Sequence, residues 1–396
     1  MSFKFTAPSA LGAALMLIAS VAPAHSMTAP ANPSLQRGSG VAQGGTPPAA
    51  SKPLAAHHAR ALERDQARHQ KIKQALAARQ GEMKMAVLYA AVPGAVQAVG
   101  ADMLATAMGS GLRLGESVEH GLWVRASRTD RRPTADTTLR SRFGQLSTTS
   151  RLDQSLMSAQ IGTPIYGSGN TRVDATLGMG GSRTEVSGRA RDTQLNTYAA
   201  SLGLILEHRM AVGLDLRLGT QIMGGTSELK GAGQGKNKGD FKQKFKHQGI
   251  GLRAEAGWGL PLSSRLTATP LIGMSANLVR VKQNKIKTED HTTGQLWAGT
   301  RLAYQHDMQN GRTTSLWVEP TYISQVSRTT TVDAKLAGLN FSADSRLPRS
   351  SMGARIGADI AVGKQGSIEA GVSRFWAVGS DRHSESAVHL GYVHRI

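Results

Sequence analysis

The spacing of hydrophobic residues changes along the chain and separates a helical N-terminal part from a C-terminal part built of strands. From Glu119 onward, apolar residues recur at every second position, which is the period of a β-strand. The segment from Met210 to Gly224 is the clearest example. Four successive positions on one of its faces are leucine or valine, while the other face carries Asp215 and Arg217. A sheet with one purely apolar face and one charged face is therefore expected.

Twelve segments alternate in this way. They are 119–127, 150–162, 171–187, 192–208, 211–226, 242–257, 264–281, 292–306, 313–327, 350–362, 366–378 and 385–396. Each is about as long as, or longer than, the roughly 9–11 residues with which a tilted strand crosses a bilayer. A soluble sandwich or lipocalin-like barrel also alternates, but its strands are usually only about 5–6 residues long.

The connections between these segments alternate in length. Even-numbered connections are short and turn-like, as at Gly167–Asn170 and Gly363–Gly366. Several odd-numbered connections are long and polar: 128–149, 227–241, 282–291 and 328–349. Short turns on one side, long loops on the other and an even strand number are typical of outer-membrane barrels. We predict an all-β fold, a 12-stranded antiparallel outer-membrane β-barrel over residues 119–396.

The N-terminal residues predict export. Residues 1–26 combine Lys4, an apolar stretch from Leu11 to Ala22 and small residues before Ser26, which is the pattern of a signal peptide. The alternative is a retained membrane anchor, for which the apolar stretch is short. Residues 27–53 are rich in Pro, Ala, Gly and Ser and predict a flexible linker. Residues 54–82 carry good helix formers and many cations, and predict a short solvated helix.

Residues 83–114 predict a slender helix followed by a junction to the first strand. Alanine and glycine dominate up to Met108, and a break is expected at Pro93-Gly94. The small side chains, Gln97 and Asp102 favour a helix packed inside protein. The length of the segment also allows a helix that spans the bilayer, and this alternative stays open.

Several sequence phrases resemble the pertactin-type autotransporter translocator domain of type V secretion. The junction Gly111-Leu112-Arg113-Leu114 followed by Gly121-Leu122-Trp123-Val124-Arg125 is similar to the start of that domain. Looser matches are Arg253–Trp258, Ala354–Ala358 and Leu390–Ile396. The resemblance covers about residues 95–396. The strand count, the preceding helix and the C-terminal position of the barrel make it specific, whereas no single phrase does.

The resemblance implies a barrel whose N-terminal passenger crosses the outer membrane and whose helix then stays in the pore. It places Arg113, Trp123 and Arg125 at the helix junction. It also implies an assembly signal at Gly391, Tyr392 and Ile396 that is read by the barrel-assembly machinery. This family usually ends in an aromatic residue, with another two positions earlier, where this chain has Ile396 and His394. The passenger, residues 27–82, is unusually short.

The inward faces of the strands carry charges that suit a wet lumen. The candidates for lining it are Asp215, Arg217, Arg253 and Glu255. They are expected either to contact the pore helix or water, or to pair with one another across strands. No catalytic, cofactor or metal site is predicted. The chain has no Cys, and its His, Ser and Asp residues form no recognisable constellation, so an enzyme is not expected.

The charge balance adds one further expectation. Lys and Arg number 47 against 27 Asp and Glu, a formal net charge of +20. Candidate polyanion-binding residues lie on and beside two long connections: Arg131, Arg132, Lys236, Lys238, Lys242 and Lys244. They could neutralise lipopolysaccharide phosphates, or bind a host polyanion or serum protein. Specific nucleic-acid binding is not expected, and the barrel is expected to be monomeric. The functions in play are an autotransporter translocator, a surface adhesin or serum-resistance factor, and a plugged channel.

Overall fold

The computed structural model describes most of the C-terminal part of the chain. The described residues are 85, 87–109, 121–141, 144–187, 193–231, 241–282, 290–307, 313–327, 329–336, 339–363, 365–379 and 383–395. The expected signal peptide, linker and helical passenger lie outside them, as do Arg113, Lys236, Lys238 and Ile396.

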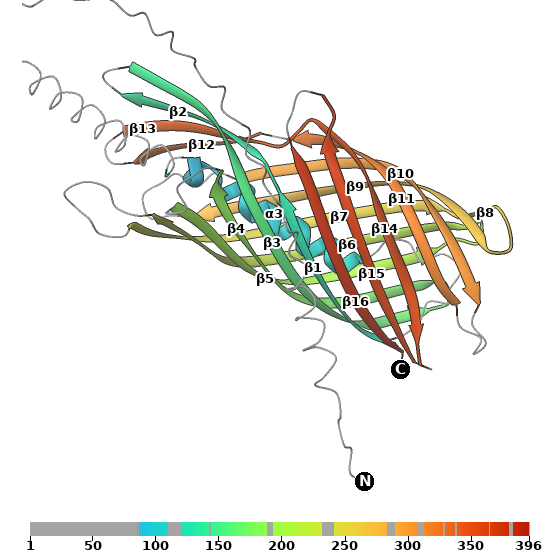
Figure 1. Ribbon diagram of the computed structural model, residues 1–396. Coiled ribbons are helices and arrows are strands. Elements are labelled where there is room, and N and C mark those ends of the chain that lie inside the picture. Colours follow the sequence, from blue (N-terminus) through green and yellow to red (C-terminus); the bar gives the residue numbers. More distant parts are fainter. Residues whose placement is uncertain are drawn as a thin grey trace, which may run out of the picture. The chain divides into compact units, whose positions relative to one another are not determined.

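Twelve long strands form a closed antiparallel barrel (Figure 1). They are β1 (Gly121–Arg131), β3 (Gly144–Ser168), β4 (Thr171–Val186), β5 (Thr193–Arg209), β6 (Leu214–Gly231), β7 (Phe241–Trp258), β9 (Leu266–Lys282), β10 (Asp290–Asp307), β11 (Thr313–Ser327), β14 (Ser350–Val362), β15 (Gly366–Ala377) and β16 (Ser384–Arg395). β1 pairs with both β3 and β16, so the sheet has no edge within the barrel wall. Each predicted segment overlaps one of these strands, and the 12-stranded barrel is confirmed.

Two connections that we expected to be loops contain strands instead. Part of 128–149 forms β2 (Thr134–Ser141), which pairs with the first residues of β3, and 328–349 contains β12 (Thr329–Leu336) and β13 (Leu339–Arg346). β13 also pairs with β2, so the two connections join in one sheet. The expectation of loops was wrong because each of these strands has only eight residues and at most three apolar positions. Such a segment is shorter than the roughly 9–11 residues by which a bilayer-crossing strand is recognised. The short β8 (Leu260–Pro261) pairs with β9 beside a tight turn.

The wall of the barrel is apolar outside and polar inside. On β6, Leu218 and Ile222 are 40% and 59% exposed, whereas Arg217 and Gln221 on the opposite face are buried. The neighbouring strand β5 follows the same rule, with Leu202 exposed and Ser201 buried. The exposed apolar side chains belong to the outer face, as expected for a barrel whose wall meets lipid.

The helix α3 (Val92–Met108) lies inside the barrel (Figure 1). A short helical stretch over residues 87–90 precedes it and ends at a turn at Ala91. Pro93 therefore sits in the first turn of α3, where its missing N–H costs nothing, and the break lies just before Pro93-Gly94. Among the described residues, no helix combines the length and the apolar character needed to cross a membrane.

Candidate functional site: the helix in the barrel lumen

The direction of α3 follows from its contacts at both ends. Before the helix, the Tyr89 ring meets the Phe245 ring edge-on at 5.2 Å, near the end of the barrel that carries the long connections. At the other end, the Met108 carbonyl accepts a hydrogen bond from Arg217, close to the short turn before β6. α3 therefore runs from the long-connection end of the barrel toward the short-turn end.

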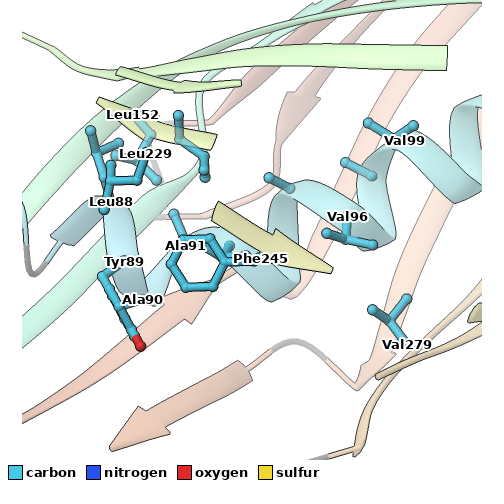
Figure 2. Close-up of a cluster of buried hydrophobic side chains, with 14 of the residues drawn as sticks. Leu88, Tyr89, Ala90, Ala91, Val96, Val99, Leu152, Leu229, Phe245 and Val279 are labelled. Atoms are coloured by element: carbon cyan, nitrogen blue, oxygen red, sulfur yellow. The ribbon is translucent and has the colours of Figure 1, made fainter. Parts of the chain in front are cut away.

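An apolar collar surrounds the start of the helix. We use this name for Val87–Val92, Val96 and Val99 together with the wall residues that enclose them: Leu152, Leu156, Leu195, Leu229, Phe245 and Val279 (Figure 2). Ala135 of β2 and Val332 of β12 join the same cluster, so the strands of the two long connections also contact it. Burying one such side chain stabilises by about 1.5–3 kcal/mol. The collar is the larger of two buried apolar clusters that the described residues form around the helix, and the second joins Ala107 and Met108 to Trp123, Ile205 and Val393.

Small residues let the helix and the wall approach closely. A Cβ on Gly100 would lie 2.7 Å from Met223 Cε, and a Cβ on Gly180 would lie 2.8 Å from Met103 Cγ. Each glycine thus receives a methionine side chain from the opposing element. This agrees with the expectation from the sequence that the small side chains of this segment favour a helix packed inside protein.

The middle of the helix is held by hydrogen bonds. Asp102 accepts from the Ser127 and Thr129 hydroxyl groups at 2.9 and 2.8 Å. The Thr106 hydroxyl lies 2.8 Å from that of Ser127 and 2.7 Å from that of Ser158. These partners stand on β1 and β3, so one polar stripe of the helix faces one polar stripe of the wall.

Two arginines satisfy the C-terminal carbonyl groups of α3. Arg125 donates to the Ala107 carbonyl at 2.5 Å, and Arg217 donates to the Met108 carbonyl. The last carbonyl groups of a helix have no partner within the helix and carry partial negative charge, which cations offset. Glu369 holds Arg125 at 3.0 Å. The wall therefore caps the helix.

The other predicted lumen residues pair within the wall. Asp215 binds Arg209 at 2.7 Å, and Glu255 binds Arg253 at 2.6 Å. Both outcomes considered from the sequence therefore occur: Arg125 and Arg217 contact the helix, whereas Asp215, Arg253 and Glu255 contact wall residues. Trp123 is buried and donates from Nε1 to Asp174 at 2.7 Å.

A repeated stack in the lumen was not foreseen. An inward tryptophan lies against the glycine directly opposite on the next strand, and an arginine packs over the face of the same ring. The glycine, tryptophan and arginine of the three stacks are Gly162, Trp123 and Arg125; Gly273, Trp297 and Arg253; and Gly357, Trp317 and Arg301. The guanidinium carbons lie 4.2–4.4 Å from the ring centroids, within cation–π range.

α3 does not fill the lumen. A cavity of about 250 Å³ lies beside it, lined by Ala101, Asp102 and Ala105 of the helix and by residues of β11, β14, β15 and β16. Arg355 and Glu369 are among the charged groups that face this space. Among the features of the described residues, this cavity supports the interpretation of the barrel as a partly plugged channel.

The basic candidates from the sequence fall in different places. Arg131 turns toward the helix and donates to Gln154 at 2.5 Å and to the Gly94 carbonyl. Arg132 is exposed and pairs with Asp153 at 3.3 Å. Lys242 and Lys244 are exposed at the start of β7, beside the long connection that precedes it.

The expected assembly signal lies partly within the described residues. Gly391 and Tyr392 are on β16, the strand that closes the barrel against β1. Gly391 is buried on the lumen side, where a Cβ would lie 3.1 Å from Arg125 Cγ. Tyr392 faces outward and is 39% exposed.

Comparison with known proteins finds relatives of this barrel. The model of the autotransporter beta-domain family matches residues 138–373 of the chain. The transport unit of the autotransporter AIDA-I from Escherichia coli is similar, with 13% identity, 77% coverage of this chain, 99% coverage of that chain and a TM-score of 0.55. The translocator domain of NalP from Neisseria meningitidis is 17% identical, with 78% coverage of this chain, 99% coverage of that chain and a TM-score of 0.53. The beta domain of the Bordetella autotransporter BrkA is 14% identical, with 70% coverage of this chain, 100% coverage of that chain and a TM-score of 0.50. No curated protein matches the chain.

Proposed function

The chain belongs to the autotransporter β-domain family and is an outer-membrane protein, and from that premise we propose that it exports its own N-terminal segment. The exported passenger is residues 27–82, which precede the helical stretch over residues 87–90 that leads into α3. After export, α3 stays in the lumen and closes most of it. The barrel then displays the short passenger at the cell surface.

The direction of α3 carries this proposal. The helix enters from the long-connection end of the barrel, and outer-membrane barrels place long loops outside the cell and short turns in the periplasm. The chain before Tyr89 therefore leads to the exterior, whereas the chain after Met108 leads toward the periplasmic start of β1. Such a hairpin path is what export of an N-terminal segment through the barrel requires.

Surface labelling tests the proposal. The chain has no Cys, so a single introduced thiol reports its own location. On intact cells, a membrane-impermeant maleimide is expected to label full-length protein carrying Ser51→Cys. The control Ser168→Cys, at the short turn between β3 and β4, is expected to stay unlabelled until the outer membrane is permeabilised. Labelling of Ser168→Cys but not Ser51→Cys on intact cells would contradict the export of residues 27–82.

Two partner assignments accompany the proposal. Gly391, Tyr392 and Ile396 at the chain's end would be read by the barrel-assembly machinery, since β16 is the strand that must join β1 to close the barrel. The wall would also contact lipopolysaccharide in the outer leaflet. Binding of a host polyanion or serum protein gains less support, because Arg131 is turned toward α3 and Arg132 is paired with Asp153.

A plugged channel remains a second candidate function, favoured by the cavity beside α3. Deleting residues 85–110 from the full chain is expected to raise single-channel conductance in planar bilayers. An unchanged closed pore would count against a plugged lumen. This readout is independent of surface labelling, so the two functions can be separated.

A further inference from the structure

A row of lysines lies on the outward face of β7. Reading that face from the long-connection end gives Lys242, Lys244, Lys246 and Gln248, all exposed, and then the exposed apolar residues that begin with Ile250. The neighbouring strands add Lys230 on β6 and Arg280 and Lys282 on β9. Six cations therefore share one outward patch, which we call the rim patch, at one end of three adjacent strands.

Two carboxylates neutralise only part of the rim patch. Glu228 binds Lys242 at 2.6 Å and Lys230 at 3.2 Å, and Asp290 binds Arg280 at 2.6 Å. Among the described residues, Lys244, Lys246 and Lys282 form no ion pair. Within the part of the chain that the structure describes, no carboxylate lies within ion-pair distance of these three outward ammonium groups.

The strand register brings two of these cations face to face. Lys246 on β7 is directly opposite Lys282 on β9. Like charges at directly opposed positions destabilise a sheet, and their Cβ atoms are only about 4.5–5.5 Å apart. An anion bound between them would remove the repulsion. By contrast, the outward Arg183 on β4 pairs with Glu185 two positions away at 2.5 Å.

The position of the rim patch relative to the apolar wall indicates what the anion belongs to. Ile250 and Leu278 are opposite one another and are 54% and 43% exposed, which marks the upper limit of the apolar face here. Lys246 is four residues further along β7, or about 13 Å along a tilted strand. Lysine stems can also bend toward a polar layer. The ammonium groups therefore reach the headgroup layer and point sideways, away from the mouth of the barrel.

We propose that Lys244, Lys246 and Lys282, supported by Lys230 and Lys242, bind the phosphate groups of a lipid in the outer leaflet, the lipid A part of lipopolysaccharide. Paired lysines suit a phosphate because each ammonium donates several hydrogen bonds to its oxygens. The proposal rests on the membrane orientation proposed above. The sequence predicted that basic residues here bind a polyanion, and the proposal identifies that polyanion as a membrane lipid instead of a soluble host molecule.

Lipid A with both phosphates is the probe that tests this site. Full-length protein in detergent is titrated with it, and the shift in the heat-unfolding midpoint is followed by gel mobility. Addition of lipid A is expected to raise the unfolding midpoint of the parent protein at low salt. The rise should be smaller at high salt, where charges are screened. In Lys244→Gln/Lys246→Gln/Lys282→Gln, the apparent affinity is expected to fall by about tenfold or more, since each basic residue near an anionic surface contributes measurably.

Two control variants and two control ligands distinguish the possible outcomes. Arg183→Gln, at an internally paired outward arginine, is expected to keep the affinity of the parent protein. Lys246→Arg/Lys282→Arg keeps both charges and is expected to retain binding. If the triple variant fails to fold, loss of binding in this charge-preserving variant would contradict the proposal. Equal stabilisation of the triple variant, or equal stabilisation by lipid A without phosphates, would overturn the proposal. A heparin oligosaccharide that stabilises as well as lipid A would overturn it in favour of a soluble polyanion. Surface labelling of Ser51→Cys does not depend on lipid A binding, so the export proposal and the lipid A proposal are tested independently.

Discussion

Gly273 has no side chain in the place that the Trp297 ring occupies. A Cβ built there would lie 2.2 Å from the ring, well inside van der Waals contact, and Arg253 packs over the face of the same ring. The same arrangement recurs at Trp123 and Trp317. A large aromatic side chain thus shields a glycine backbone and supports an arginine at once. These stacks give the lumen wall rigid, buried contacts without placing apolar groups where the helix needs hydrogen bonds.

Gly273→Ala tests the stack. The added methyl group forces the Trp297 ring away from the strand and disturbs its contact with Arg253, so we expect unfolding free energy to fall by about 1–3 kcal/mol. Urea unfolding followed by tryptophan fluorescence measures this. The matched control is Gly224→Ala on the outer face of β6, where the nearest heavy atom to a new Cβ is 3.9 Å away. Equal stability of Gly273→Ala and Gly224→Ala would show that the ring does not need the glycine.

Only part of this residue-scale picture could be predicted. Alternation alone placed Asp215 and Arg217 on the inward face, because a period of two assigns every residue to one of two sides. The pairing of Trp317 with Gly357 depends on which residues of β11 and β14 stand opposite one another. That register is fixed by turn geometry and by packing across the lumen, neither of which leaves a signal in a single sequence. The identity of the partners therefore had to come from the structure.

At the scale of elements, α3 is held by three kinds of contact that follow one another along its length. The apolar collar binds its start, hydroxyl groups bind Asp102 and Thr106 in its middle, and arginines cap its end. The sequence predicted the helix and its small residues. It missed β2, β12 and β13, because eight residues with two or three apolar positions are too short to stand out as barrel strands.

Replacing Val96 and Val99 with Asn tests the collar. Both valines are buried against the wall, and burying an amide without partners costs about 1–3 kcal/mol per residue. We expect Val96→Asn/Val99→Asn to loosen the helix, with longer and more frequent openings in single-channel recordings. Ala101→Asn/Ala105→Asn is the control, since those positions line the cavity on the other side of the helix. If the control variant opened as often as the collar variant, the collar would not be what retains the helix.

At the scale of the whole molecule, the barrel inverts the usual order of a soluble fold. Its outer face presents Leu177, Leu202, Ile250 and Ile272, each more than half exposed, while arginine and glutamate pairs are enclosed in the lumen. An arrangement of this kind is stable only if hydrocarbon meets the outer face. The cost of a charge on that face should accordingly depend on its depth in the bilayer.

Two substitutions on one face of β10 measure that depth dependence. Ala298 lies in the middle of the strand, exposed and opposite the exposed Ile272, whereas Thr292 is exposed near the long-connection end. In lipid vesicles, Ala298→Arg is expected to lower unfolding free energy by about 2–4 kcal/mol and Thr292→Arg by only about 0–1 kcal/mol. The difference should shrink in detergent micelles, whose surface adapts more readily to a charge. Equal costs for both variants in vesicles would mean that Ala298 does not face hydrocarbon, and the membrane placement of the barrel would then be wrong.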